Sequence, residues 1–326
     1  MTHLPFSNDL PPLLSGFGLR AVTEAAARAA FDWISRGDRV QGDAAARVAM
    51  LAQLARQPID GTIIVGDIAQ DQTNGPFPIG NNEEPGIFPQ FDIAVDPTEG
   101  TSYLQQGLTN AMAVIALVPR GTMFDPGSAF HMEKFAGPPV LKGKIDPTAP
   151  VAAKLEAMSR LLDKPIAEMT IYVLEKPRHR ELVEQIHLAG ARVALYPAGD
   201  VAGGIMAAIP DSGIDAMMGT GGTPEGILCA CAIRAMGGEF MGRLAPQLAT
   251  EKLAVERSGT DTTRWLMTEE LVKSDRVFFC ATGISTGLML TGVERTKDYE
   301  TTQTLMVSGP LGERQILTTH HRRNAG

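Results

Sequence analysis

Short apolar runs alternate with helix-like segments along residues 170–236, and this alternation constrains the fold more than any other feature of the chain. The runs predict strands at residues 170–174, 192–196 and 214–218, and the segments after them predict helices at residues 181–188, 201–209 and 223–236. Because the connections are short, the pattern favours an α/β layer with parallel strands. The loops at the carboxyl ends of parallel strands gather at one edge of a sheet, where ligands usually bind.

The rest of the chain shows the same kinds of element with less regular spacing. Residues 18–35 predict an Ala-rich amphipathic helix, and Asp43 is the expected N-cap of a second helix. Further strands are predicted at residues 62–65, 92–95, 111–117, 277–281 and 304–307, and a proline-rich loop at residues 76–90. A change of composition near residues 140–165 divides the 326 residues into two expected domains, residues 1–160 and 161–326.

Charge and hydropathy exclude two classes of partner. The formal net charge is −8, and the acidic chain lacks the electrostatic footprint of a nucleic-acid-binding protein. The longest apolar stretch, residues 111–118, is far shorter than the roughly 20 residues that a membrane helix needs. The amino-terminal residues do not show the pattern of a secretory signal, so a cytoplasmic location is expected. The three cysteines are an odd number and are expected to be buried free thiols.

Acidic residues recur just after the ends of the predicted strands. Asp67, Asp96 with Glu99, Asp200 and Glu225 all follow apolar runs in this way. If these strand ends converge, the carboxylates would repel one another unless a cation lay between them. Carboxylate oxygens suit Mg²⁺ or Mn²⁺, and Mg²⁺ usually binds a few carboxylates together with phosphate oxygens. The alternative is that each Asp is present only because Asp is common in turns.

Two further segments have compositions typical of ligand-binding loops. Residues 219–226 are glycine-rich and precede a predicted helix, with Thr223 as the expected N-cap. They lack the Gly-Lys-Ser/Thr end of an ATP-binding P-loop, and Pro224 stands where a dinucleotide-binding loop needs glycine. ATP-binding and NAD-binding interpretations of this loop are therefore rejected. Residues 176–180 place basic side chains at the start of a helix, which fits phosphate binding, with a solvated basic cluster as the alternative.

Several motifs follow one another in order along most of the chain. They are Ser35-Arg-Gly-Asp-Arg39 with Asp43, Asp60-Gly-Thr-Ile-Ile-Val-Gly66, Val95-Asp-Pro-Thr-Glu-Gly-Thr101, Met132-Glu-Lys134, Lys176-Pro-Arg-His179, Gly199-Asp-Val-Ala202, Gly219–Gly226 with Gly242-Arg-Leu244, and Ala281-Thr-Gly-Ile284. In this order they resemble the motifs of class II fructose-1,6-bisphosphatases. That family is a branch of the lithium-sensitive, metal-dependent sugar and inositol phosphatase superfamily.

The resemblance implies a fold and a reaction. The implied fold is an α/β architecture, a layered α+β sandwich of two domains of the sugar-phosphatase type. The implied reaction is hydrolysis of the 1-phosphate of fructose 1,6-bisphosphate, with sedoheptulose 1,7-bisphosphate as a second substrate, in gluconeogenesis or in pentose- or Calvin-type carbon metabolism. The implied cofactor is Mg²⁺ or Mn²⁺, the implied partner is a small sugar phosphate, and a homodimer or homotetramer is expected.

Matched residue by residue, the resemblance also implies site residues. The implied metal ligands are Asp43, Asp67, Asp96, Glu99, Glu225 and the carbonyl of Thr98. The implied catalytic residues are Asp43 and Thr101, which position and deprotonate the attacking water, together with Asp67. The implied substrate contacts are Thr101, Ser102, His131, Lys176, Arg178, Asp200 and Gly222, and among these Lys176 and Arg178 hold the phosphate that is not cleaved.

A few positions depart from the family pattern. Asp67 replaces a Glu ligand and is one methylene shorter, which puts water activation in question. Arg39 stands in place of Lys, His131 in place of Tyr, and Ala198 in place of the first Asp of a sugar-binding Asp-Gly-Asp. The altered sugar contacts at Ala198 and His131 leave one alternative open, and the shorter ligand at Asp67 leaves a second. One is a phosphatase of the same mechanism on another sugar or cyclitol phosphate, and the other is a catalytically impaired paralogue that binds sugar phosphate.

Overall fold

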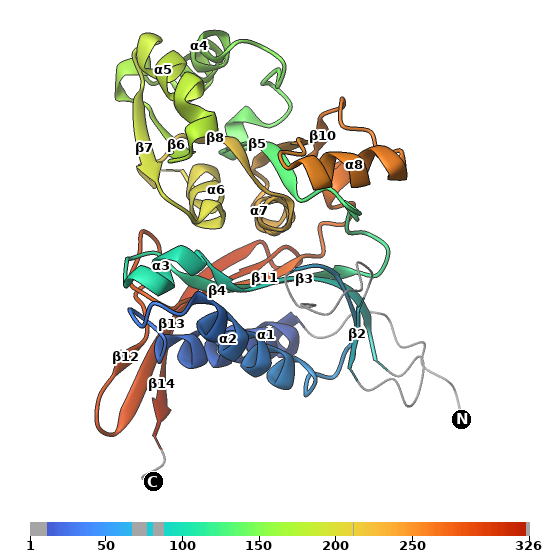
Figure 1. Ribbon diagram of the computed structural model, residues 1–326, viewed down its shortest axis with the longest axis vertical. Helices are drawn as coiled ribbons and strands as arrows, with labels where there is room; N and C mark the ends of the chain where they lie inside the picture. Colours follow the sequence, from blue (N-terminus) through green and yellow to red (C-terminus); the bar gives the residue numbers. More distant parts are fainter. Residues whose placement is uncertain (1–11, 67–76, 81–87, 211, 324–326) are drawn as a thin grey trace. The chain divides into compact units, whose positions relative to one another are not determined.

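The computed structural model describes residues 12–66, 77–80, 88–210 and 212–323 of the chain, which form two compact units (Figure 1). Unit 1 combines the described residues up to 123 with residues 276–323, and unit 2 holds the described residues between 124 and 275. The predicted division at residue 160 differs from this arrangement. The physical reason is strand pairing, because the last strands of the chain pair into the sheet that the first strands begin.

Unit 1 is built on an eight-stranded sheet with the order β12-β13-β11-β4-β3-β1-β2, in which β14 also pairs with β13. Its strands are β1 (Asp60–Val65), β2 (Phe77–Gly80), β3 (Gln90–Glu99), β4 (Met112–Pro119), β11 (Phe278–Gly283), β12 (Glu294–Arg295), β13 (Tyr299–Ser308) and β14 (Glu313–Arg322). Only β1 and β3 pair in parallel within this sheet, and every other described pair is antiparallel. The parallel strands predicted for residues 170–236 therefore concern unit 2, and the sheet of unit 1 is mainly antiparallel.

Helices α1 (Pro12–Phe31) and α2 (Arg39–Leu54) pack beside each other against one face of this sheet (Figure 1). The face of α1 that meets the sheet is lined with small side chains, and Ala26, Ala27 and Ala30 are fully buried. Small side chains let the helix axis come close to the strands, which explains why an Ala-rich sequence is suited to this position.

The N-cap of α2 differs from the prediction. The helix begins at Arg39, and the Asp38 side chain accepts a hydrogen bond from the backbone N–H of Gln41 at 3.0 Å. Asp38 is therefore the cap, and Asp43 lies inside the helix, where it is buried. Both residues are Asp at the start of one helical pattern, so the pattern alone could not decide between them.

Unit 2 is built on a six-stranded sheet with the order β10-β9-β5-β8-β6-β7. Its strands are β5 (His131–Gly137), β6 (Thr170–Leu174), β7 (Arg192–Tyr196), β8 (Ala216–Gly222), β9 (Glu239–Leu244) and β10 (Leu266–Met267). Strand β6 is parallel to β7 and β8, which confirms the parallel layer predicted for residues 170–218. Strands β5, β9 and β10 extend the sheet in antiparallel fashion and were not predicted.

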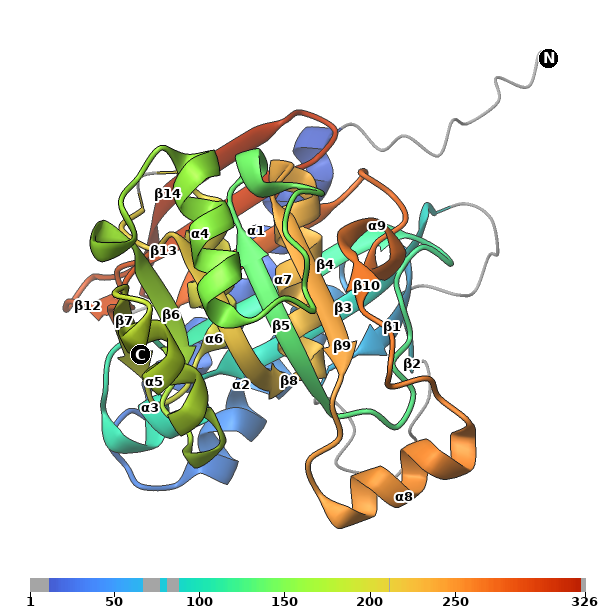
Figure 2. The same cartoon turned by 90° about the horizontal axis from the view of Figure 1, so that it is seen from above.

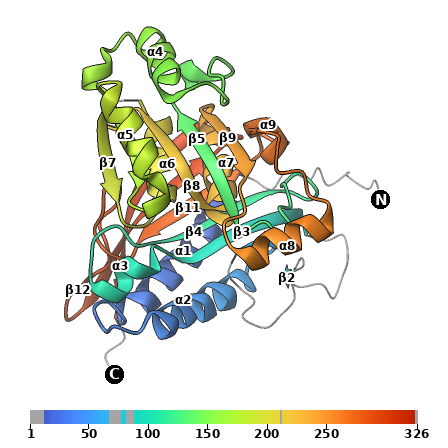
Figure 3. The same cartoon turned by 45° about the horizontal axis from the view of Figure 1, so that its top comes forward.

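Helices cover both faces of the unit 2 sheet (Figures 2 and 3). On one face, α4 (Val151–Leu162) and α5 (Arg180–Leu188) enclose an apolar core with the sheet. On the other face lie α6 (Asp200–Ala208) and α7 (Thr223–Met236), which contact each other and the strands. The remaining helices are α8 (Ala249–Ser258) and α9 (Thr268–Leu271), with 3-10 turns at Pro139–Leu141, Ile166–Glu168 and Pro177–His179.

All three cysteines are free and buried, as predicted. In the described part of the chain, no helix has both the length and the apolar character needed to cross a membrane.

Candidate active site

The end of β3 brings three of the predicted unit 1 residues together. Between two paired positions, β3 advances by three residues, from Asp96 to Glu99, while β4 advances by two, from Val114 to Met112. Strand β3 therefore bulges there. The strand was expected to end before Asp96, but the bulge carries it through Pro97 to Glu99. The backbone N–H of Thr98 donates to Oδ1 of Asp96 at 3.0 Å. The segment therefore holds its acidic side chains on a locally bent strand rather than on a free turn.

This strand end is buried, and it leads directly into a short helix. Thr98 is 1% exposed and Glu99 is 3% exposed. Gly100, with a φ of 83°, reverses the chain so that Thr101 and Ser102 begin α3 (Thr101–Gln106). The hydroxyl of Thr98 is buried and makes no hydrogen bond with any described residue. A buried hydroxyl oxygen without a partner is compatible with an oxygen-binding cation or with a hydroxyl of a ligand at this place.

Asp43 belongs to the same unit and comes from α2, which packs on β3 and α3. Its carboxylate lies 3.9 Å from the Arg47 guanidinium one helical turn later. Asp67, the remaining acidic residue predicted for the first half of the site, lies outside the described residues. Among the residues that the structure describes, no three His, Cys, Asp or Glu side chains are grouped closely enough to hold a metal ion by themselves.

In unit 2, a buried lysine accompanies the predicted acidic residues. The Nζ atom of Lys134, on β5, donates to Oδ2 of Asp200 at 2.6 Å, and the two residues are 2% and 5% exposed. Asp200 is the first residue of α6 and follows Gly199, whose φ is 77°. One oxygen of the carboxylate predicted to contact sugar is thus already bonded to the protein.

Glu225 lies close to this pair, in the first turn of α7. Its Oε2 atom is buried and has no hydrogen-bond partner among the described residues. Burial raises the pKa of Glu225, and the nearby Asp200 carboxylate raises it further, while Lys134 acts in the opposite direction. A desolvated carboxylate oxygen with no partner fits a divalent cation, which would supply the missing positive charge.

Lys134 was not predicted as a site residue, although its motif was singled out. Burial opposes its charge, but the carboxylates of Asp200 and Glu225 outweigh that effect, so the pKa of Lys134 is raised. The available signal was its place on β5, where Lys134 lies two residues after buried Met132 and therefore shares its inward face. A lysine at an inward position of a strand implies a nearby carboxylate.

Two glycines make room for these carboxylates at the end of β8. A Cβ atom on Gly221 would lie 2.0 Å from Oδ2 of Asp200, and one on Gly222 would lie 1.9 Å from Oε2 of Glu225. Gly222 has a φ of −70°, so the space beside it rather than its backbone conformation demands glycine. Gly222 is also the N-cap of α7, one residue before the predicted cap at Thr223.

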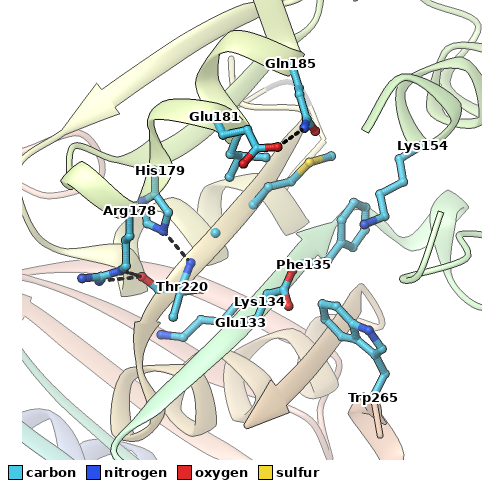
Figure 4. Close-up of a pocket in the computed structure, with 13 residues that line it drawn as sticks. Glu133, Lys134, Phe135, Lys154, Arg178, His179, Glu181, Gln185, Thr220 and Trp265 are labelled. Atoms are coloured by element: carbon cyan, nitrogen blue, oxygen red, sulfur yellow. Dashed lines mark hydrogen bonds between the residues drawn. The ribbon is translucent and has the colours of Figure 1, made fainter. Parts of the chain in front are cut away.

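The basic loop after β6 lies against the same strand end. The Nε and Nη2 atoms of Arg178 donate to the carbonyl oxygen of Thr220 at 3.0 and 2.7 Å (Figure 4). Lys176 precedes the 3-10 turn Pro177–His179, and its backbone N–H donates to the Leu174 carbonyl at 2.8 Å. Arg178 is exposed, so the rest of its guanidinium faces solvent and is available to an anion.

His131, predicted to contact substrate, is held by a residue that the sequence did not indicate. Its Nδ1 atom lies 2.8 Å from Oε2 of Glu251 on α8. Oε1 of the same carboxylate accepts hydrogen bonds from the backbone N–H groups of Phe130 and His131, both at 2.7 Å. Glu251 therefore fixes the start of β5 and leaves Nε2 of His131 as the ring atom that could meet a ligand.

The buried carboxylate of Glu225, which has an unpartnered oxygen, and the basic loop at a strand end are the kinds of group with which enzymes that hydrolyse phosphoric monoesters bind a cation and a phosphate. The comparison with known families is more specific. The family model described as bacterial fructose-1,6-bisphosphatase, glpX-encoded, matches residues 15–321, and the chain belongs to this family.

Curated relatives agree with the family match. The chain is 37% identical over 314 residues to "Fructose-1,6-bisphosphatase 1 class 2" of Escherichia coli strain K12, which covers 92% of this chain and 93% of that protein. The same values hold for "Fructose-1,6-bisphosphatase class 2" of Shigella flexneri. Among solved structures, an inositol monophosphatase from Anabaena (Nostoc) sp. PCC 7120 aligns with a TM-score of 0.33 and 16% identity, covering 60% of this chain and 72% of that one.

Proposed function

We propose that the chain hydrolyses the 1-phosphate of fructose 1,6-bisphosphate and releases the sugar monophosphate and inorganic phosphate. The observation that carries this proposal is the family match, which extends over residues 15–321, together with 37% identity to class 2 fructose-1,6-bisphosphatase over 92% of the chain. The buried carboxylates and the basic loop supply chemistry that such a reaction needs.

We propose that a divalent cation, Mg²⁺ or Mn²⁺, assists the reaction. The residues that would hold it are Asp43, Asp67, Asp96, Glu99, Glu225 and the carbonyl of Thr98, and the unpartnered Oε2 of Glu225 supports this set. A cation there would neutralise the negative charge that develops on the phosphoryl oxygens.

The protein's own residues have separate tasks in the proposal. The Thr101 hydroxyl orients the attacking water, and the Asp43 carboxylate accepts its proton as the oxygen approaches phosphorus. Lys176 and Arg178 hold the phosphate that is not cleaved, which places the other phosphate for in-line attack. Asp200 accepts a hydrogen bond from a sugar hydroxyl through Oδ1, because its Oδ2 is bonded to Lys134. Ser102, His131 through Nε2, and Gly222 complete the proposed substrate contacts.

Sedoheptulose 1,7-bisphosphate is proposed as a second substrate, because its reacting end has the same phosphate ester as that of fructose 1,6-bisphosphate. A cytoplasmic location, a homodimer or homotetramer, and a place in gluconeogenesis or in pentose- or Calvin-type carbon metabolism remain predictions that go with this substrate class.

The test is a phosphate-release assay with Mg²⁺ and with Mn²⁺ over a panel of sugar and cyclitol phosphates. Fastest turnover on fructose 1,6-bisphosphate supports the proposal. Turnover only on another ester would replace it with a phosphatase of altered specificity, and binding of esters without turnover would indicate an impaired paralogue. The variant Asp96→Asn should lose turnover because a metal-binding charge is removed, whereas Asp298→Asn, an exposed Asp of the same unit, should keep it. Full activity of Asp96→Asn would remove Asp96 from the site.

A further inference from the structure

The imidazole of His179 connects the ends of two neighbouring strands. His179 is the last residue of the 3-10 turn Pro177–His179 and is 4% exposed. Its Nδ1 atom lies 2.7 Å from the carbonyl oxygen of Leu174 at the end of β6, and the backbone N–H of Thr220 on β8 donates to its Nε2 atom at 2.8 Å (Figure 4). A carbonyl can only accept and an N–H can only donate, so the ring is neutral and carries its proton on Nδ1.

The hydrogen bonds of His179 connect β6 and β8 at a point where the two strands no longer pair with each other. The register between β6 and β8 covers only Ile171 with Ala216 and Tyr172 with Met217. Beyond that point the two strands diverge, and Thr220 is held on the β6 side by side chains. His179 binds its N–H, and the Arg178 guanidinium binds its carbonyl. Both polar backbone atoms of Thr220 are therefore fixed by adjacent residues of one loop.

A glycine on β8 permits the close approach of the imidazole. Gly219 has a φ of 133°, which residues with a side chain rarely adopt. A Cβ atom there would lie 3.0 Å from Nε2 of His179. Gly219 thus provides both the backbone conformation and the space that the bond between His179 and Thr220 requires.

We propose that His179 is a positioning residue, which aligns the Arg178 guanidinium with residues 219–222 so that Arg178 can hold the phosphate that is not cleaved. The inference rests on the proposed function, since it concerns the phosphate site assigned there to Arg178. Arg178 uses its Nε–H and one Nη2–H on Thr220, which leaves three of its five N–H groups for an anion. If Thr220 moved, the direction of those groups would change with it.

The surroundings of His179 keep its imidazole neutral, which is the form that can accept the hydrogen bond from Thr220. Arg178 and Lys176 lie in its own loop, and Asp200 faces it from α6. On the face of the sheet that α4 and α5 cover, His179 also lines a cavity of about 250 Å³, together with Glu133 from β5, Lys154 from α4 and Glu181 from α5. Burial lowers the pKa of His179, so its Nε2 lone pair remains available to Thr220 near neutral pH.

The test measures binding of two sugar monophosphates by calorimetry, which requires no turnover. Fructose 6-phosphate carries the phosphate assigned to Arg178, and fructose 1-phosphate does not. His179→Phe keeps the ring volume and loses both nitrogens. We expect it to weaken fructose 6-phosphate binding about tenfold, as for the loss of one hydrogen bond to a charged group, and to leave fructose 1-phosphate binding within about twofold. His179→Gln, which retains an acceptor, should recover part of the loss. His187→Phe, on the exposed side of α5, is the matched control and should change neither affinity.

A double-mutant cycle shows whether His179 acts through Arg178. The pair His179→Phe with Arg178→Gln should bind fructose 6-phosphate no more weakly than Arg178→Gln alone. Should His179→Phe fail to fold, Gly219→Ala disturbs the same contact and should give the same selective loss. Equal weakening of both ligands, additive effects in the cycle, or no binding of fructose 6-phosphate by the wild type would overturn the inference. If the wild type binds this ligand but does not hydrolyse fructose 1,6-bisphosphate, the proposed function fails, and the calorimetry still decides the role of His179.

Discussion

The buried pair of Lys134 and Asp200 gives a quantitative prediction. Lys134→Met keeps an unbranched side chain of similar length and removes the charge from a residue that is 2% exposed. Asp200, 5% exposed and bonded to Lys134 at 2.6 Å, would lose its partner, and Glu225 would lose its nearest positive charge. Breaking a buried ion pair by removing one partner costs about 3–5 kcal/mol. We expect a decrease of this size in the free energy of unfolding of unit 2.

Urea denaturation can measure this decrease in unit 2 alone. The chain has two tryptophans, and a Trp33→Phe background leaves only Trp265, which belongs to unit 2, as the fluorescent reporter. With an m-value of about 2 kcal/mol per M, the midpoint should fall by roughly 1.5–2.5 M. Adding Asp200→Asn to Lys134→Met should recover part of the loss, because the unpaired charge is then removed.

The control is Lys142→Met, which breaks the bond of Lys142 to Glu269 at 2.7 Å in the same unit. Both of those side chains are more than a third exposed, so the loss should stay below about 1 kcal/mol. If Lys134→Met destabilised unit 2 no more than Lys142→Met does, the reasoning from burial would be refuted.

Three further predictions concern the carboxylates. Burial raises the pKa of Glu225 above 4.5, so its charge destabilises the metal-free fold at neutral pH. Glu225→Gln should therefore raise the melting temperature at pH 7. The gain should vanish below about pH 4.5, where Glu225 is neutral in both the folded and the unfolded protein. A gain that persisted at low pH would contradict this origin. Gly222→Ala would place a Cβ atom 1.9 Å from Oε2 of Glu225. It should weaken Mn²⁺ binding in calorimetry while the circular dichroism spectrum stays unchanged. Unaltered Mn²⁺ affinity would show that Glu225 does not bind the metal. Asp67→Glu should increase turnover with Mn²⁺ if the shorter side chain limits catalysis, and a decrease would show that Asp67 suits its surroundings.

Local pattern was sufficient for short apolar runs and for a helix with a clear start signal. The strands predicted at 170–174 and 192–196 coincide with β6 and β7, and the helix predicted at 223–236 coincides with α7. Strand β5 was missed because its sequence, HMEKFAG, contains three ionisable residues, and only tertiary contacts make one of them an inward residue. Strand β14 was missed for a related reason, since it is mostly exposed and alternates polar residues with few apolar ones.

The candidate site was predictable as a set of residue types but not as a set of contacts. The acidic residues after strand ends could be singled out because strand patterns are local. The partner of Asp200 could not, because Lys134 lies 66 positions away, and the partner of His131 lies 120 positions away. Which carboxylate bonds a protein cation, and which keeps an unpartnered oxygen, depends on these distant residues.

The glycine-rich end of β8 illustrates how composition and contact combine. The sequence excluded the two common nucleotide-binding loops there and did not indicate a role for the glycines. In the structure, glycines 219, 221 and 222 each remove a Cβ that would lie within 3.0 Å of a functional atom, on His179, Asp200 and Glu225 respectively. A strand end without side chains lets polar groups from the β6 loop, α6 and α7 approach one backbone segment. The glycines therefore serve close packing of charged and polar side chains, and any side chain introduced at one of them should disturb the one group that it faces.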